Sequence, residues 1–136
     1  MQNSSAPQSA PPVVGVIDPD PVARSGLRTL LHGLGIDVST FDSAESFLLT
    51  GSGRHVACLI VDLLLPGMSG LELLRRLRTA GNDVPVILLA DESDVPTAVA
   101  AMREGATDFI EKPYVDVAVL KQVQKLLHTP PASANV

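Results

Sequence analysis

The chain has 136 residues, the length of a single domain that can bury about two-thirds of its unfolded surface. Its hydrophobic content of 46% excludes a disordered chain, and its formal net charge of −5 argues against nucleic-acid binding. Because no run of about 18 apolar residues occurs, no segment is expected to span a membrane. Residues 1–12 are rich in Ser, Ala, Gln and Pro and lack the order of a signal peptide, so we expect a disordered segment and a cytoplasmic protein.

Short apolar runs alternate with helical patterns along the rest of the chain. Strands are predicted at residues 13–17, 36–41, 56–62, 84–90 and 107–111. The helices between and after them are predicted to begin at Asp20-Pro21, at Asp42 or Ser43, near Gly70, at Pro96 and at an Asp116 cap. Arg75, Arg76 and Arg78 are expected on a solvated helix face. Residues 129–136 return to Pro, Ala and Ser and predict a linker or tail.

Strands that alternate with helices predict βαβ units and a parallel sheet covered on both faces. The second strand alternates between apolar and polar residues, as a half-exposed edge strand does. Together with right-handed crossovers, this pattern favours a doubly wound α/β fold of the flavodoxin-like type, with five strands in the order 2-1-3-4-5.

The stretch from Cys58 to Gly70 is the most informative part of the sequence. Its apolar residues run without alternation into Asp62, which predicts a strand buried on both faces and makes Cys58 a core residue. Pro66-Gly67 then predicts a turn, and Ser69 can cap the next helix. Asp62 should therefore end a central strand, where open α/β sheets bind ligands. The alternative is a loop aspartate that caps a nearby N–H.

Other strands of the predicted sheet also end in charged residues. Asp18 follows the first strand, which neighbours the third in this order, and Lys112 follows the fifth. Two carboxylates at ~5 Å repel each other by roughly 3 kcal/mol at an effective dielectric of ~20. The site therefore favours a divalent cation, a lysine or both, and oxygen ligands suit Mg²⁺. An aspartate beside these cations can act as a nucleophile towards a phosphoryl group.

Over about residues 13–128 the chain resembles the receiver domain of two-component response regulators, whose fold is called CheY-like. Residues 94–114 are most similar to the FixJ-type subfamily. The motifs that carry the resemblance are Asp18-Pro19-Asp20, Val61-Asp62-Leu63, Pro66-Gly67-Met68-Ser69-Gly70, Gly105-Ala106 and Asp108-Phe109-Ile110-Glu111-Lys112-Pro113-Tyr114.

The resemblance implies a signalling domain in a phosphorelay, not an enzyme. Asp62 would accept a phosphoryl group from a histidine kinase or a phosphotransfer protein, and Lys112 would be its ion-pairing partner. Mg²⁺ would be bound by Asp18, Asp62 and the backbone carbonyl of Leu64. A homodimer formed through the last helices and the fifth strand is a further expectation.

The resemblance also implies two features of the chain near the fifth strand. The peptide bond before Pro113 would be cis, an event essentially restricted to proline. Phe109 would be the aromatic residue whose rotamer reports activation. Both residues lie within the motif that surrounds Lys112.

Two positions depart from the pattern of the family. Receivers carry two adjacent acids after the first strand, but Pro19 occupies the second position, so weakened Mg²⁺ binding is expected. Asp20 could reach the metal if the turn folds inward, although its role as an N-cap is favoured. Ala90 stands where the family has a Thr or Ser whose hydroxyl binds the phosphoryl oxygen, which predicts a weakened switch.

These departures leave a second hypothesis open, a degenerate receiver that binds proteins independently of phosphorylation. A flavin-binding protein of the same fold is disfavoured because a flavin phosphate needs N–H groups and hydroxyls. The segment Asp18-Pro19-Asp20-Pro21 offers carboxylates and two residues without an N–H. His32, His55 and His128 are scattered and are predicted to be surface residues.

Overall fold

The structure, a computed structural model, describes residues 12–51 and 55–128. A five-stranded parallel sheet in the order β2-β1-β3-β4-β5 lies at its centre, which confirms the predicted fold class. The predicted disordered segment and the predicted tail lie outside the described residues, apart from Pro12. The strands are β1 (Val13–Ile17), β2 (Asp37–Phe41), β3 (Cys58–Asp62), β4 (Val86–Ala90) and β5 (Asp108–Glu111).

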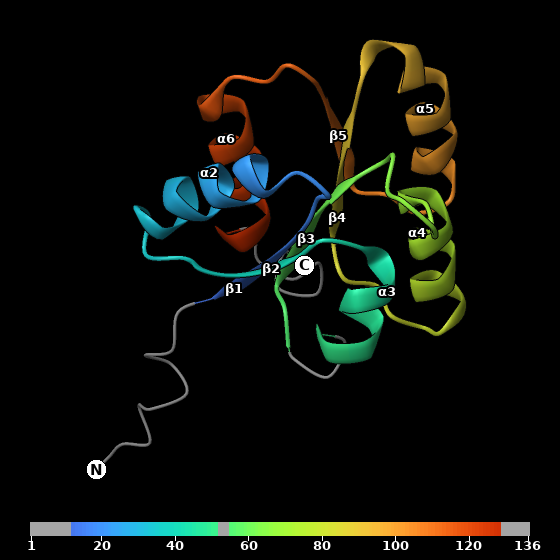
Figure 1. Cartoon of the computed structure of the whole chain (residues 1–136), viewed down its shortest axis with the longest axis horizontal. Coiled ribbons are helices and arrows are strands. Elements are labelled where there is room, and N and C mark those ends of the chain that lie inside the picture. Colours follow the sequence, from blue (N-terminus) through green and yellow to red (C-terminus); the bar gives the residue numbers. More distant parts are fainter. Residues whose placement is uncertain (1–11, 52–54, 129–136) are drawn as a thin grey trace, which may run out of the picture.

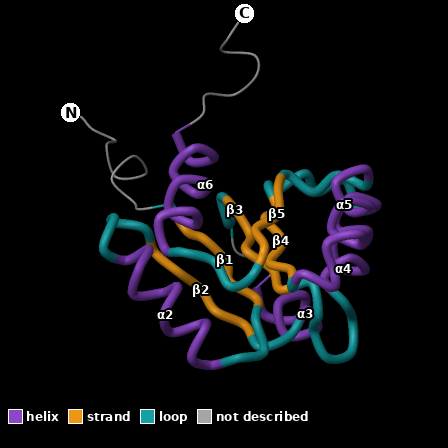
Figure 2. Tube along the Cα trace, turned by 90° about the horizontal axis from the view of Figure 1, so that it is seen from above, coloured by secondary structure: helices purple, strands orange, loops and turns teal. Residues whose placement is uncertain are grey.

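Helices cover both faces of this sheet (Figures 1 and 2). One face carries α2 (Pro21–His32) and α6 (Asp116–His128), and the other carries α3 (Ala44–Ser46), α4 (Gly70–Thr79) and α5 (Val95–Arg103). A short π-helical turn, η1 (Phe47–Gly51), continues α3, and a 3-10 turn, η2 (Glu92–Asp94), precedes α5. No helix within the described ranges is long and apolar enough to cross a membrane.

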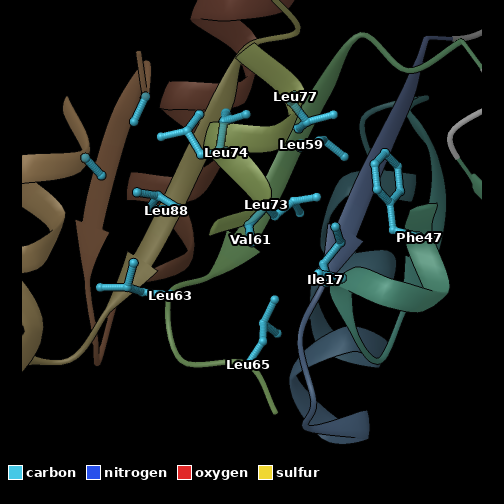
Figure 3. Close-up of a cluster of buried hydrophobic side chains, with 14 of the residues drawn as sticks. Ile17, Phe47, Leu59, Val61, Leu63, Leu65, Leu73, Leu74, Leu77 and Leu88 are labelled. Carbon is cyan, nitrogen blue, oxygen red and sulfur yellow. The ribbon is translucent and has the colours of Figure 1, made fainter. Parts of the chain in front are cut away.

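Each face of the sheet has its own hydrophobic core, and β3 contributes to both. Leu59 and Val61 pack in the cluster under α3, α4 and α5, whereas Cys58 and Ile60 pack in the cluster under α2 and α6. Figure 3 shows the first cluster, where leucines of α4 meet Leu59 and Val61. Burying one such aliphatic side chain contributes about 1.5–3 kcal/mol. An unbroken apolar run was therefore the correct sign of a strand covered on both faces.

Side-chain caps begin several helices as the sequence predicts. The Asp20 carboxylate accepts a hydrogen bond from the Val22 N–H at 2.9 Å, with Pro21 in the first position of α2. Ser69 caps α4 through the Glu72 N–H at 3.1 Å. Of the two candidates before α3, Ser43 is the cap. These caps fix where the chain leaves the carboxyl edge of the sheet.

The structure corrects several predicted boundaries. The third and fourth strands begin two residues later than predicted, at Cys58 and Val86. Pro85 has no N–H to donate, so regular pairing of β4 begins after it. Asp116 lies in the first turn of α6 and is not a cap that precedes it.

The arginines of α4 make specific contacts, so the prediction of a solvated face was incomplete. Arg75 forms an ion pair with Glu104, at 2.6 Å from its Nε to Oε1. Arg78 donates a hydrogen bond to the Gly105 carbonyl at 2.8 Å. Arg76 pairs with Glu72 on its own helix at 3.4 Å. Two of the three therefore tie α4 to the end of α5.

Candidate functional site

Asp62 is the last residue of β3 and is buried, with 5% of its surface exposed. Both of its carboxylate oxygens have partners. Oδ1 accepts a hydrogen bond from the Leu64 N–H at 3.0 Å, and Oδ2 lies 3.0 Å from Lys112 Nζ. The carboxylate is therefore held in one orientation at the carboxyl edge of the sheet.

Asp18 is the second buried acid, with 3% of its surface exposed. It directly follows β1, whose residue Ile17 pairs with Val61, so Asp18 and Asp62 follow paired positions of neighbouring strands. Burial and the charge of Asp62 raise the pKa of Asp18, although the hydrogen bond from the Asp20 N–H and the charge of Lys112 lower it. Two buried carboxylates at one strand edge are thus electrostatically unfavourable when no cation is bound.

Lys112 directly follows β5 and lies between acids from two strand ends. Its Nζ is 3.0 Å from Asp62 Oδ2 and 3.9 Å from Asp91 Oδ1. Burial lowers the pKa of Lys112, but the hydrogen bond to Asp62 and the charges of Asp62, Asp91 and Asp18 outweigh burial and raise it above its usual value. The ammonium therefore stays charged and offsets part of the negative charge of the site.

Pro19 and Asp20 form a tight turn beside Asp18. The Asp20 N–H donates to Asp18 Oδ1 at 2.9 Å, and the Asp20 carboxylate points to the N-terminus of α2, where it caps Val22. Pro19 is exposed and contributes no carboxylate. The structure therefore gives Asp20 the role that the sequence favoured, an N-cap.

The two expected switch positions lie in one hydrophobic cluster. Ala90 ends β4 with 1% of its surface exposed, and Phe109 packs partly buried against the same cluster. The Ala90 carbonyl accepts a hydrogen bond from the Lys112 N–H at 2.8 Å. The Lys112–Pro113 peptide bond is cis. The methyl group of Ala90 offers no hydrogen-bond donor towards the site.

Three contacts near the site were not found from the sequence. Arg24 donates to the Asp18 carbonyl at 2.7 Å, Glu45 accepts from the Met68 N–H at 2.8 Å, and Asp91 approaches Lys112. Arg24 lies one helical turn after the Asp20 cap, and this spacing is the signal in the sequence that could have placed it near Asp18. Glu45 and Met68 are 23 residues apart, and no local pattern relates them.

The acids of the site suit a hard divalent cation. Asp18 and Asp62 supply buried oxygens whose mutual repulsion a dication would relieve, and the backbone of Leu64 lies against Asp62. Among the described residues no group of three His, Cys, Asp or Glu side chains is arranged to hold a metal. A cation here would depend on two carboxylates, backbone oxygens and water, which is how proteins commonly bind Mg²⁺.

Comparison with known proteins identifies this arrangement. The sequence model of the response regulator receiver domain matches residues 14–124. The transcriptional regulatory protein FixJ of Azorhizobium caulinodans is 42% identical over 121 residues, which cover 89% of this chain and 56% of that protein. The C4-dicarboxylate transport transcriptional regulatory protein DctD of Pseudomonas aeruginosa is 41% identical over 122 residues, 90% of this chain and 26% of that protein. The chain thus spans about half the length of FixJ and about a quarter of DctD.

Solved structures show the same similarity. Full-length FixJ from B. japonicum matches with a TM-score of 0.84 at 34% identity, covering 91% of this chain and 61% of that chain. A response regulator receiver protein from Pseudomonas putida matches with a TM-score of 0.80 at 33% identity, covering 86% of this chain and 98% of that chain. Sequence and structure agree over nearly the whole described sheet, so this chain belongs to the family of response regulator receiver domains, the phosphorylated signalling domains of two-component systems.

Proposed function

We propose that this receiver accepts a phosphoryl group on Asp62 from the phosphohistidine of a histidine kinase or a phosphotransfer protein. The observation that supports this assignment is the buried, oriented Asp62 carboxylate at the end of the central strand, 3.0 Å from Lys112 Nζ. The domain acts as a signalling module and not as an enzyme with a substrate of its own.

In the transfer, one carboxylate oxygen of Asp62 forms a bond to phosphorus while the bond from phosphorus to the donor's imidazole nitrogen breaks. The electron pair of that bond stays on the nitrogen. Leu64 N–H and Lys112 hold the nucleophile in place, and the Lys112 ammonium offsets the charge that the phosphoryl oxygens bring. Mg²⁺ held by Asp18, Asp62 and the Leu64 carbonyl would add charge neutralisation that one lysine does not supply.

The alternative is a receiver that binds partners without being phosphorylated. Two observations favour it. The carboxylate of Asp20 caps α2, so Pro19 is not compensated by that acid, and Ala90 provides no hydroxyl beside the site. Under this alternative the partner-binding surface would be the same in the presence and absence of a phosphodonor.

A homodimer through α5, β5 and α6 belongs to the same proposal. Four exposed apolar side chains lie on this part of the chain, and contact with a second copy would remove them from water. They are Val99, Met102, Val115 and Val117. Sedimentation with and without a phosphodonor would show whether these residues support association, and Val99→Ser should weaken it.

Labelling tests the phosphoacceptor directly. Incubation with acetyl phosphate and Mg²⁺, followed by peptide mass spectrometry, should add one phosphoryl group to the peptide that contains Asp62. Asp62→Asn should abolish the label, and Asp37→Asn should leave it unchanged because Asp37 is exposed on the edge strand. Label on Asp18 or Asp20, or a wild-type chain that takes no label from acetyl phosphate or a phosphohistidine donor, would contradict the assignment.

A further inference from the structure

The loop at residues 63–69, which connects Asp62 to α4, is held by one hydrogen bond to the last residue of β3 and by another that joins its two ends. The Leu64 N–H donates to Asp62 Oδ1 at 3.0 Å, and the Gly70 N–H donates to the Leu63 carbonyl at 3.0 Å. Gly70 also lies so close to β3 that an added Cβ would stand 2.7 Å from the Asp62 carbonyl. The geometry of this loop and the orientation of the Asp62 carboxylate are therefore linked.

The far part of the same loop is held by Glu45. Glu45 Oε2 accepts a hydrogen bond from the Met68 N–H at 2.8 Å. At Gly67, where φ is +73°, an added Cβ would stand 2.5 Å from the same oxygen. Position 67 thus requires glycine for two reasons: its backbone is left-handed, and the Glu45 carboxylate occupies the space that a Cβ would need. The hydrogen bond from Met68 is also the main reason that the pKa of Glu45 is lowered.

Glu45 itself is presented from a fixed position. It lies in the first turn of α3, which Ser43 caps and which the fully buried Ala44 and the nearly fully buried Phe47 anchor in the core. The core therefore holds the backbone of Glu45 in place independently of the loop that its exposed carboxylate contacts. Because Met68 lies 23 residues away, the contact joins two separate connections at the carboxyl edge of the sheet.

We propose that Glu45 is a positioning residue for phosphoryl transfer, because it holds the 63–69 loop and thereby the Leu64 backbone against Asp62. This inference rests on the proposed role of Asp62. Loss of the Glu45 carboxylate releases the Met68 N–H and lets the loop relax away from β3. The Leu64 N–H then orients the phosphoacceptor less well, and the Leu64 carbonyl is less well placed towards a cation.

The amide signals of the chain test this link without a metal or a phosphodonor. In Glu45→Ala, the chemical shift of the Met68 amide proton should change because its hydrogen bond is lost, and the chemical shift of the Leu64 amide should change as well. Glu45→Gln keeps an acceptor oxygen and should restore most of both signals. Glu72→Ala is the matched control, since Glu72 is an exposed glutamate of α4 whose carboxylate pairs with Arg76. A Leu64 amide that stays unchanged in Glu45→Ala would overturn the proposal.

Mg²⁺ affinity and labelling provide the functional readout. Glu45→Ala should weaken Mg²⁺ binding and slow labelling by acetyl phosphate by about threefold, the scale of one exposed charged contact, and should lower the melting temperature by no more than a few degrees. Gly67→Ala should have a smaller effect on Leu64 in the Glu45→Ala background, because the collision with Oε2 is then absent. Equal Mg²⁺ affinity and equal labelling in Glu45→Ala and the wild type would overturn the link. A wild type that binds Mg²⁺ but takes no label contradicts the role of Asp62 and leaves the amide measurement to decide the role of Glu45.

Discussion

Replacement of Asp18 by asparagine should stabilise the fold at neutral pH while it impairs the site. The asparagine side chain keeps an oxygen for the Asp20 N–H, which donates to Asp18 at 2.9 Å, but it removes the negative charge beside Asp62. Burial is the largest cost of this charge, and the charge of Asp62 adds to it. Two carboxylates at ~5 Å repel by roughly 3 kcal/mol at an effective dielectric of ~20. The Lys112 ammonium offsets part of this repulsion. We therefore expect a gain of about 1–2 kcal/mol in the free energy of unfolding, or about 5 °C in melting temperature, without Mg²⁺.

The pH dependence follows from the raised pKa of Asp18. The folded chain binds a proton at Asp18 more tightly than the unfolded chain, in which the pKa has its ordinary value of 3.8. Ionised Asp18 therefore destabilises the folded state, fully at pH values above the folded pKa and less as the pH falls through that pKa towards 3.8. The advantage of Asp18→Asn should be complete at pH 7 and should shrink near pH 4.

Thermal and urea unfolding of the wild type and of Asp18→Asn, at pH 7 and at pH 4, measure this difference in the free energy of unfolding. Asp37→Asn is the control, since Asp37 is an exposed acid whose carboxylate also accepts a backbone N–H, from Val38 at 3.0 Å. Added Mg²⁺ should stabilise the wild type more than the variant, because ligands stabilise the state that binds them. If Asp18→Asn is no more stable than the wild type at pH 7, or if its advantage persists unchanged at pH 4, the electrostatic argument fails.

Two further predictions concern the departures from the family pattern. Pro19→Asp should tighten Mg²⁺ binding about tenfold, or roughly 1.4 kcal/mol, whereas Asp20→Ala should leave that affinity unchanged while it removes the cap of α2. Weaker Mg²⁺ binding in Asp20→Ala would show that this acid reaches the cation. Ala90→Thr should increase the amide shifts that beryllofluoride induces over residues 90–105 and 109–114, at a stability cost of about 1–3 kcal/mol because position 90 is 1% exposed. Large shifts in the unmutated chain would show that another donor replaces the hydroxyl.

The sequence alone determined the order of the elements and most of the site. Apolar runs without alternation mark strands covered on both faces, as the burial of all five residues of β3 shows. Local chemistry also marks where helices begin, so the helix caps Asp20 and Ser69 could be predicted. Because parallel strands bring their carboxyl ends to one edge, Asp18, Asp62 and Lys112 could be placed together from the strand order.

The tertiary structure decided what depends on distances between segments far apart in the chain. Only the packed sheet shows that Asp91 lies 3.9 Å from Lys112 and that the Asp20 carboxylate is turned to the helix. The third and fourth strands were predicted to begin at residues 56 and 84, two residues too early, because residues beside a strand share its composition. Pairing with a neighbouring strand decides where each strand begins, here at Cys58 and Val86. Glu45 and Met68 meet across 23 residues only after α3 and the 63–69 loop are packed on the same core. A single exposed carboxylate carries no periodic signal, so its partner is fixed by the fold and not by its neighbours in sequence.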